Sequence, residues 1–200
     1  VATRPAMYNG IRHFLFVVPP LAVLAGVMGS RLLQGARQLG GAPVLAGVAV
    51  LVVGIAAPTI EMARLHPYQY VYFNHVAGGV RGAEGRYMLD YWGLAFRQAS
   101  LELLRVVAER GLEPEGGRKW KIAVCGPHPP AEVVLGEQFE LTWDPKGADF
   151  AMMLGAFYCR SFEAPVLLEV KREGVLFARV YDIRGRTFDS LFTIPPVQSD

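Results

Sequence analysis

Charged residues are missing from two long stretches near the start of this 200-residue chain. None occurs from Phe14 to Ser30, and none occurs from Gln38 to Ile60. Core helices of soluble proteins usually keep a polar face, so these stretches favour membrane spans over a pair of buried core helices, which is the alternative. The hydrophobic share of 52% is thus concentrated in the first third, and the rest is typical of a globular domain.

Several motifs of soluble enzymes are also absent. There is no Gly-x-Ser-x-Gly, no P-loop and no dinucleotide-binding glycine pattern, and the glycine-rich Ala77–Gly85 lacks the Lys-Ser/Thr of a Walker loop. We expect a flexible loop there. Two cysteines and four scattered histidines lack the ligand spacing of a zinc site. Asp144 and Asp149 flank a Pro-Lys-Gly turn, and turn formation explains both.

A strong charge of either sign is lacking as well. Residues 1–64 hold five arginines and one acidic residue, which leaves 15 basic and 17 acidic residues in the remainder. A near-neutral domain gives no reason to expect nucleic acid as a partner. The chain opens at Val1 without a Met or a signal-peptide pattern, so we expect Val1 to be an internal position of a longer protein.

The two apolar stretches predict transmembrane helices at about residues 14–33 and 42–60, because about 20 apolar residues cross a bilayer core. Pro19-Pro20 should kink the first helix, which suits a helix in a bundle. The connection between the spans holds Arg31 and Arg37 and no acidic residue, so the positive-inside rule puts it in the cytoplasm. Both flanks then face outward.

Helix and strand signals typical of a small α/β domain follow the spans. Phe96, Ala99, Leu103 and Val106 recur at helical spacing before Gly111. Strand-like or amphipathic segments lie at Trp120–Gly126, Ala131–Glu137, Phe139–Trp143 and Phe150–Leu154, and Val166–Ile183 predicts a hairpin turning at Arg172-Glu173-Gly174. We therefore predict two transmembrane helices over residues 1–63, followed by a small extracytoplasmic α/β domain over residues 64–200.

Three motifs carry a family resemblance: YNGIRHFLFVVPPLAVLAG at Tyr8–Gly26, HPYQYVYFN at His66–Asn74, and DYWG at Asp90–Gly93. In this order they resemble bacterial glycosyltransferase family 39-like proteins, which are polytopic GT-C type relatives of protein O-mannosyltransferases and lipid A aminoarabinose transferases. The resemblance covers residues from about Tyr8 to Arg97.

The resemblance implies an enzyme of the cytoplasmic (inner) membrane, multi-pass, with its C-terminal domain outside. It implies transfer of a sugar from a polyprenyl-phosphate donor to a protein or a lipid/glycan acceptor. The catalytic acidic residues of the family lie in an outer loop that nothing here matches, so this part alone should be inactive. The partners are membrane lipid, the donor and the remaining transmembrane helices. No cofactor is predicted for this chain, and a divalent metal in the full-length enzyme is left open.

A non-enzymatic reading stays open, in which a membrane-anchored extracytoplasmic domain binds a partner or acts as a scaffold. A transporter is a third interpretation, but transporters usually carry ionisable residues within their spans, and these two stretches have none.

The first group of candidate binding residues precedes the first span and comprises Tyr8, Asn9, Arg12 and His13. Arginine suits the phosphate of a lipid-linked donor because its planar guanidinium makes charged, bidentate hydrogen bonds. The alternative is a snorkelling arginine beside an interfacial tyrosine, which would only anchor the helix end.

The second group follows the second span and comprises His66, Tyr68, Tyr70 and Asn74. In an extended chain these even-numbered residues would share one face with Tyr72 and form a platform for a sugar or a lipid headgroup. An interfacial aromatic belt explains the same pattern.

The third group is Asp90, Tyr91 and Trp92, at the passage from a loop into the predicted helix. Asp90 could bind an acceptor, or it could simply cap the helix.

Cys125 and Cys159 are the only cysteines. An extracytoplasmic domain permits a disulfide between them, and two unpaired buried thiols are the alternative.

Overall fold

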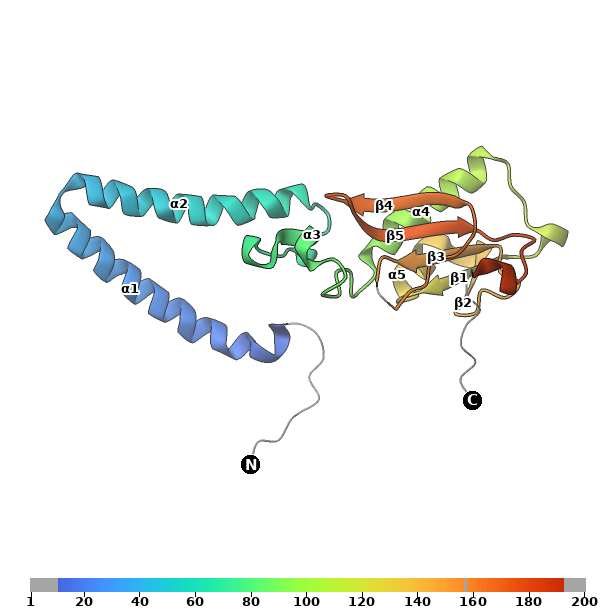
Figure 1. Ribbon diagram of the computed structural model, residues 1–200, viewed down its shortest axis with the longest axis horizontal. Coiled ribbons are helices and arrows are strands. Elements are labelled where there is room, and N and C mark those ends of the chain that lie inside the picture. The colour runs from blue at the N-terminus through green and yellow to red at the C-terminus, as the bar shows by residue number, and fades with distance from the viewer. Residues whose placement is uncertain (1–10, 157, 193–200) are drawn as a thin grey trace, which may run out of the picture. The chain divides into compact units, whose positions relative to one another are not determined.

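The structure, a computed structural model, describes residues 11–156 and 158–192, with side chains from Phe14 onward (Figure 1). The chain forms two compact units, residues 1–59 and residues 60–200, and each is described by itself.

The first unit consists of helices. A 3₁₀ helix, η1 (Ile11–Val17), leads into α1 (Val18–Leu39), and Gly40 joins α1 to α2 (Gly41–Arg64). Two stretches, Phe14–Leu39 with 26 residues and Gly41–Arg64 with 24, are long and apolar enough to span a membrane. Neither α1 nor α2 contains a buried residue, so their apolar side chains lack a protein core of their own. The two long apolar helices are as predicted.

Their boundaries differ from the prediction. Arg31 and Arg37 lie inside α1, and Gly40 alone separates the helices. The lower hydropathy of residues 34–39 suggested a loop, but arginine, leucine, glutamine and alanine all favour helix. Pro19 and Pro20 lie in the first turn of α1, where a missing N–H breaks no hydrogen bond of that α-helix, and the 3₁₀ helix η1 precedes them. The expected kink stays a prediction.

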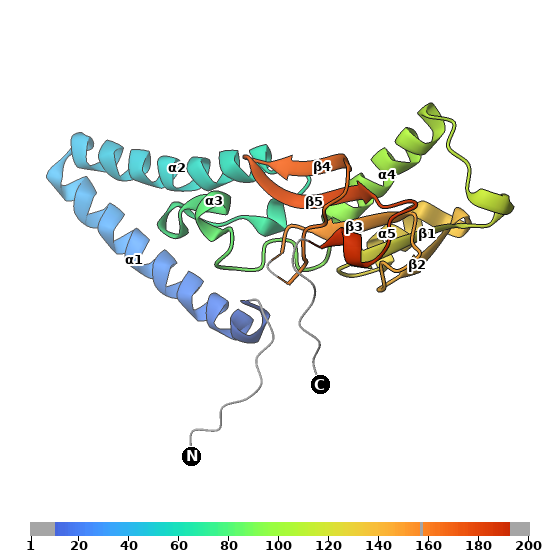
Figure 2. The ribbon, with the colours of Figure 1, turned by 45° about the vertical axis from the view of Figure 1, so that its right-hand side comes forward.

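The second unit contains a mixed five-stranded sheet of order β2-β1-β3-β5-β4 (Figure 1). β1 lies parallel to β2 and β3, whereas β5 pairs antiparallel with β3 and β4. The β4–β5 hairpin forms one edge and turns at Glu173 and Gly174, as predicted (Figure 2). The strands are β1 (Trp120–Cys125), β2 (Phe139–Thr142), β3 (Phe150–Leu154), β4 (Val166–Arg172) and β5 (Val175–Asp182).

Side chains alternate between the two faces of the sheet, as strand geometry requires. Ile122 and Met152 pack into the main core with Phe96 of α4 (Leu94–Glu109) and Leu135 of α5 (Pro129–Leu135). Ala123 and Met153 face a smaller cluster that includes Tyr181 and Leu191. The short helices of the domain are η4 (Glu115–Gly117), η5 (Gly136–Gln138) and η6 (Asp189–Leu191).

The segment from Leu65 to Gly93, here called the junction segment, joins α2 to α4. It contains η2 (Gln69–Val71), η3 (His75–Ala77) and α3 (Gly79–Ala83). The expected alternating platform is wrong, because η2 turns the chain and buries Tyr68 while Tyr70 is 48% exposed. The expected flexible loop at 77–85 is wrong as well. Asn74 caps η3, and Val80 and Ala83 of α3 enter the core.

Candidate functional site

Asp90 lies three residues before the capping residue of α4, Gly93, which has no side chain. Its Oδ1 accepts a hydrogen bond from the Leu94 N–H at 2.9 Å, and its Oδ2 accepts one from the Ala95 N–H at 2.8 Å. The Tyr70 hydroxyl donates a further, short hydrogen bond to Oδ1. The capping role is therefore confirmed, and Asp90 also ties the HPYQYVYFN motif to the DYWG motif.

Asp90 is buried, and burial raises the pKa of its carboxyl, against the lowering effect of the backbone N–H groups of Ala95, Leu94 and Gly93. The adjoining cavity measures about 10 Å³, which is room for about one water. A sugar does not fit in this space. Asp90 here supports α4 and Tyr70, and its contact with an acceptor stays a prediction.

Tyr68 is fully buried and stacks on Phe177 with ring centroids 5.3 Å apart. Its hydroxyl donates to Gln98 Oε1 at 2.7 Å, and burial raises the pKa of Tyr68 to about 12, so the hydroxyl keeps its proton. The Arg172 guanidinium lies 4.7 Å from the Tyr68 ring centroid and donates to the same Gln98 oxygen at 3.0 Å. Tyr68 therefore joins α4 to the β4–β5 hairpin.

The remaining predicted residues of the junction segment make local contacts. The Gln69 amide donates to His66 Nδ1 at 2.7 Å, and Asn74 accepts from the Ala77 N–H at 3.0 Å. Tyr91 and Trp92 meet edge to face at 4.9 Å, and Trp92 is 62% exposed. The structure thus joins Tyr70 to Asp90 and places Tyr68 in a separate set of contacts with Gln98 and Arg172. His66 and Asn74 make contacts outside both sets.

The side chains of the first candidate group are not among those that the structure describes. Tyr8 and Asn9 lie outside the described residues, and so do the side chains of Arg12 and His13. Their assignment to a donor phosphate stays a prediction.

The two cysteines are paired: Cys125 ends β1 and Cys159 lies in the loop after β3, with Cα atoms 5.8 Å apart. Tyr158 precedes Cys159 in the chain, and its pKa is raised by burial and then by the nearby Asp90 and Tyr91. Sequence reasoning missed Tyr158, although its position beside a cysteine was a usable signal. It also missed Gln98 and Arg172, which are polar residues on a helix and a strand without any motif.

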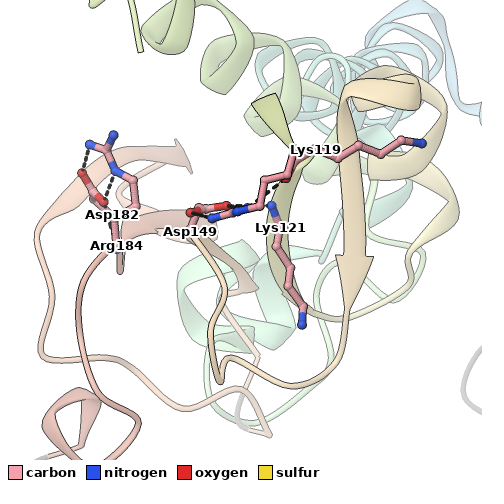
Figure 3. Close-up of polar contacts among 6 residues, drawn as sticks. Lys119, Lys121, Asp149, Asp182 and Arg184 are labelled. Carbon is pink, nitrogen blue, oxygen red and sulfur yellow. Dashed lines mark hydrogen bonds and ion pairs between the residues drawn. The ribbon is translucent and has the colours of Figure 1, made fainter. Parts of the chain in front are cut away.

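A second polar region lies where β1 and β3 begin and β5 ends (Figure 3). Arg118 donates two hydrogen bonds of 2.7 Å to the buried Asp149, which also accepts from the Lys121 N–H at 2.8 Å. Asp149 is thus more than the turn residue expected from sequence, because it ties β1 to the start of β3.

Arg184 pairs with Asp182 at 2.9 and 2.6 Å beside this region. The ammonium groups of Lys119 and Lys121 point away from the Asp149 pair in Figure 3. The open groove between the two pairs measures about 670 Å³, and both carboxylates are already satisfied by arginine. Within residues 11–156 and 158–192, no group of three or more His, Cys, Asp or Glu side chains is placed to hold a metal ion.

Comparisons with protein-family models, with curated proteins and with solved structures give no match to this chain.

Proposed function

We propose that this chain is the C-terminal part of a membrane glycosyltransferase that takes a sugar from a polyprenyl-phosphate donor and passes it to a protein or a lipid/glycan acceptor. The observation that carries the proposal is the hydrogen bond between Tyr70 and Asp90. It joins two of the three motifs that carry the family resemblance, and both follow two helices long enough to span a membrane. Residues of two motifs that contact each other in the fold are expected to occur together in a family, and this contact supports the resemblance.

The cytoplasmic membrane is the proposed location, with several spans in the whole protein and the α/β domain outside. Unburied apolar helices of 26 and 24 residues support insertion. The Cys125–Cys159 disulfide supports an extracytoplasmic domain, because disulfides persist mainly in oxidising compartments.

The catalytic carboxylates would belong to an outer loop of the upstream membrane part. The best-placed carboxylates of the α/β domain already serve other groups: Asp90 caps α4, Asp149 pairs with Arg118, and Asp182 pairs with Arg184. The domain would therefore stiffen the outer end of the helix bundle and bind lipid or acceptor beside the active site.

The structural roles of Asp90, Asp149 and Asp182 also favour a second candidate, a non-enzymatic extracytoplasmic domain that binds a partner or supports a complex. A domain whose carboxylates are structural needs no chemistry of its own. The two candidates differ in whether the protein that carries this chain consumes a lipid-linked sugar.

The test is donor consumption by membranes that contain the full-length protein carrying this chain. Radiolabelled polyprenyl-phosphate mannose, glucose and aminoarabinose would be supplied separately, and loss of label from the lipid fraction measured over time. We expect one donor to be consumed. Asp90→Ala should lower the rate at least tenfold, because the outer end of the bundle loses its support. Asp144→Ala, which removes only an exposed turn contact to the Lys146 N–H, should leave the rate unchanged.

Intact wild-type protein in the membrane that consumes none of the three donors would contradict the glycosyltransferase and favour the scaffold. Protease resistance of the domain in the same membranes shows whether a slow Asp90→Ala variant is still folded.

A further inference from the structure

The junction segment exposes large apolar side chains directly after α2. Val76 is 97% exposed, and Trp92, Tyr70 and Tyr87 are each about half exposed or more. Aromatic residues with polar edges are typical of the headgroup layer of a membrane, where the ring meets apolar chains and the polar edge meets water.

Contacts within the segment and with the β4–β5 hairpin hold these side chains in place. Tyr70 is bound to Asp90, and Phe73 stacks on Tyr87 with ring centroids 5.5 Å apart. From α3, in the middle of the segment, Arg81 Nε donates to the Glu173 backbone oxygen in the β4–β5 turn at 2.5 Å. The exposed side chains are therefore presented on a fixed scaffold, with Val76 carried by η3.

Basic residues accompany the exposed apolar ones. Arg81 and Arg86 lie on the exposed part of the segment, and the Arg86 guanidinium lies 5.9 Å from the Tyr87 ring centroid. Arginine near a bilayer surface is attracted to anionic lipid phosphates. Exposed apolar, aromatic and cationic side chains thus occur in the same segment, in which Glu84 is the one exposed acidic residue, and this combination matches a phospholipid surface better than a purely apolar protein partner.

Connectivity keeps the segment close to the bilayer. The last residues of α2, from Ile60 to Arg64, belong to the same compact unit as the junction segment. Tyr70 follows Arg64 by six residues, which limits their separation to roughly 20 Å even for an extended chain. The exposed surface is therefore continuous along the chain with a helix of membrane-spanning length.

We propose that the junction segment lies on the outer leaflet of the membrane, with Val76 and Trp92 in the headgroup layer and Arg81 and Arg86 beside lipid phosphates. This inference depends on α2 spanning the membrane. It adds a second attachment of the domain to the bilayer, besides α2.

The test places one fluorophore at a time on an exposed site. Both native cysteines are in the disulfide, so Val76→Cys supplies a single reactive thiol. The chain would be labelled with an environment-sensitive fluorophore and reconstituted in phosphatidylethanolamine/phosphatidylglycerol vesicles. Lipids with a nitroxide near the headgroup or deep in the acyl chain then report depth by quenching. Val133→Cys, on a valine of α5 that is 84% exposed, is the matched control, and Ile55→Cys in α2 reports the span itself.

We expect shallow-nitroxide lipids to quench the label at position 76 at least threefold more than the label at 133, and deep-nitroxide lipids to quench the label at 55. Quenching at 76 no greater than at 133, with 55 still quenched by deep nitroxides, would overturn the inference and leave the span intact. Shielding at 76 from both lipid nitroxides and aqueous iodide would mean that protein covers the surface, which also overturns it. An aqueous signal at 55 would reject the span and the inference together.

Discussion

At the scale of single residues, Asp90 combines two roles that sequence patterns treat as alternatives. A carboxylate ahead of a helix accepts N–H groups that have no partner within the helix. The same carboxylate accepts the Tyr70 hydroxyl, so it stabilises α4 and the junction segment at once. The contribution of Asp90 to the free energy of unfolding can be measured separately from any role in binding a sugar.

Asp90→Ala should lower the free energy of unfolding of the α/β domain by about 2–3 kcal/mol, because two N–H groups of α4 lose their acceptors near the core. Tyr70→Phe, which removes only one hydroxyl, should cost about 1 kcal/mol. Urea unfolding in detergent, followed by near-ultraviolet circular dichroism, measures both. Equal stability of Asp90→Ala and wild type would contradict the capping geometry.

Asp182 makes stability depend on pH. Its hydrogen bonds from Arg184 lower the pKa of the carboxyl, although partial burial opposes them. A folded pKa below the unfolded one means that the stabilisation is fully present above the ordinary aspartate range near pH ~4 and is lost as the pH falls through the folded pKa. Asp182→Asn should therefore flatten the acid side of the stability profile, as measured by melting temperature between pH 6 and 2.5. A slope identical to that of wild type would show that other carboxylates control the acid limb.

At the scale of elements, the loop after β3 depends on a covalent tie more than on secondary structure. The disulfide joins it to the end of β1 across 34 residues of chain. Closing a loop of that length restricts the unfolded chain. The loop also carries Tyr158 beside the DYWG motif, so the tie and the candidate site are connected.

Reduction of the disulfide should lower the free energy of unfolding of the domain by about 2–4 kcal/mol. The variant Cys125→Ala/Cys159→Ala should match the reduced wild type, and reductant should not affect it. Urea titrations with and without reductant give the comparison. A wild-type midpoint that reductant does not change would mean that the cysteines are unpaired in solution.

At the scale of the whole molecule, two helices joined by one glycine should put both flanks on the same side of a membrane. Gln38→Cys, in the last turn of α1, should react with a membrane-impermeant maleimide only after intact cells are opened, whereas Val133→Cys on the α/β domain should react from outside. Mass shifts on gels report the labelling, and the paired native cysteines stay silent. Labelling of both sites from the outside would reject this topology.

The amino-acid sequence by itself determined the elements that depend on residues close together in the chain, which are the two long helices and the β4–β5 hairpin. Uncharged apolar runs predict the two long helices, because insertion depends on local composition. Two arms with β-branched and aromatic residues predict the β4–β5 hairpin, because the arms are adjacent in the chain and the turn between them is short. The end of the first helix was misplaced, since Arg37 favours helix although its charge lowers the local hydropathy.

Only the tertiary structure decided which distant residues meet. The order β2-β1-β3-β5-β4, the cysteine pairing and the Tyr70–Asp90 contact each join residues that the chain brings together by returning on itself. The turn at η2 shows the same limit, because burial of Tyr68 against Phe177 outweighs the extended pattern that HPYQYVYFN suggests. Local patterns state what each residue can do, and the packed core selects which of those options is used.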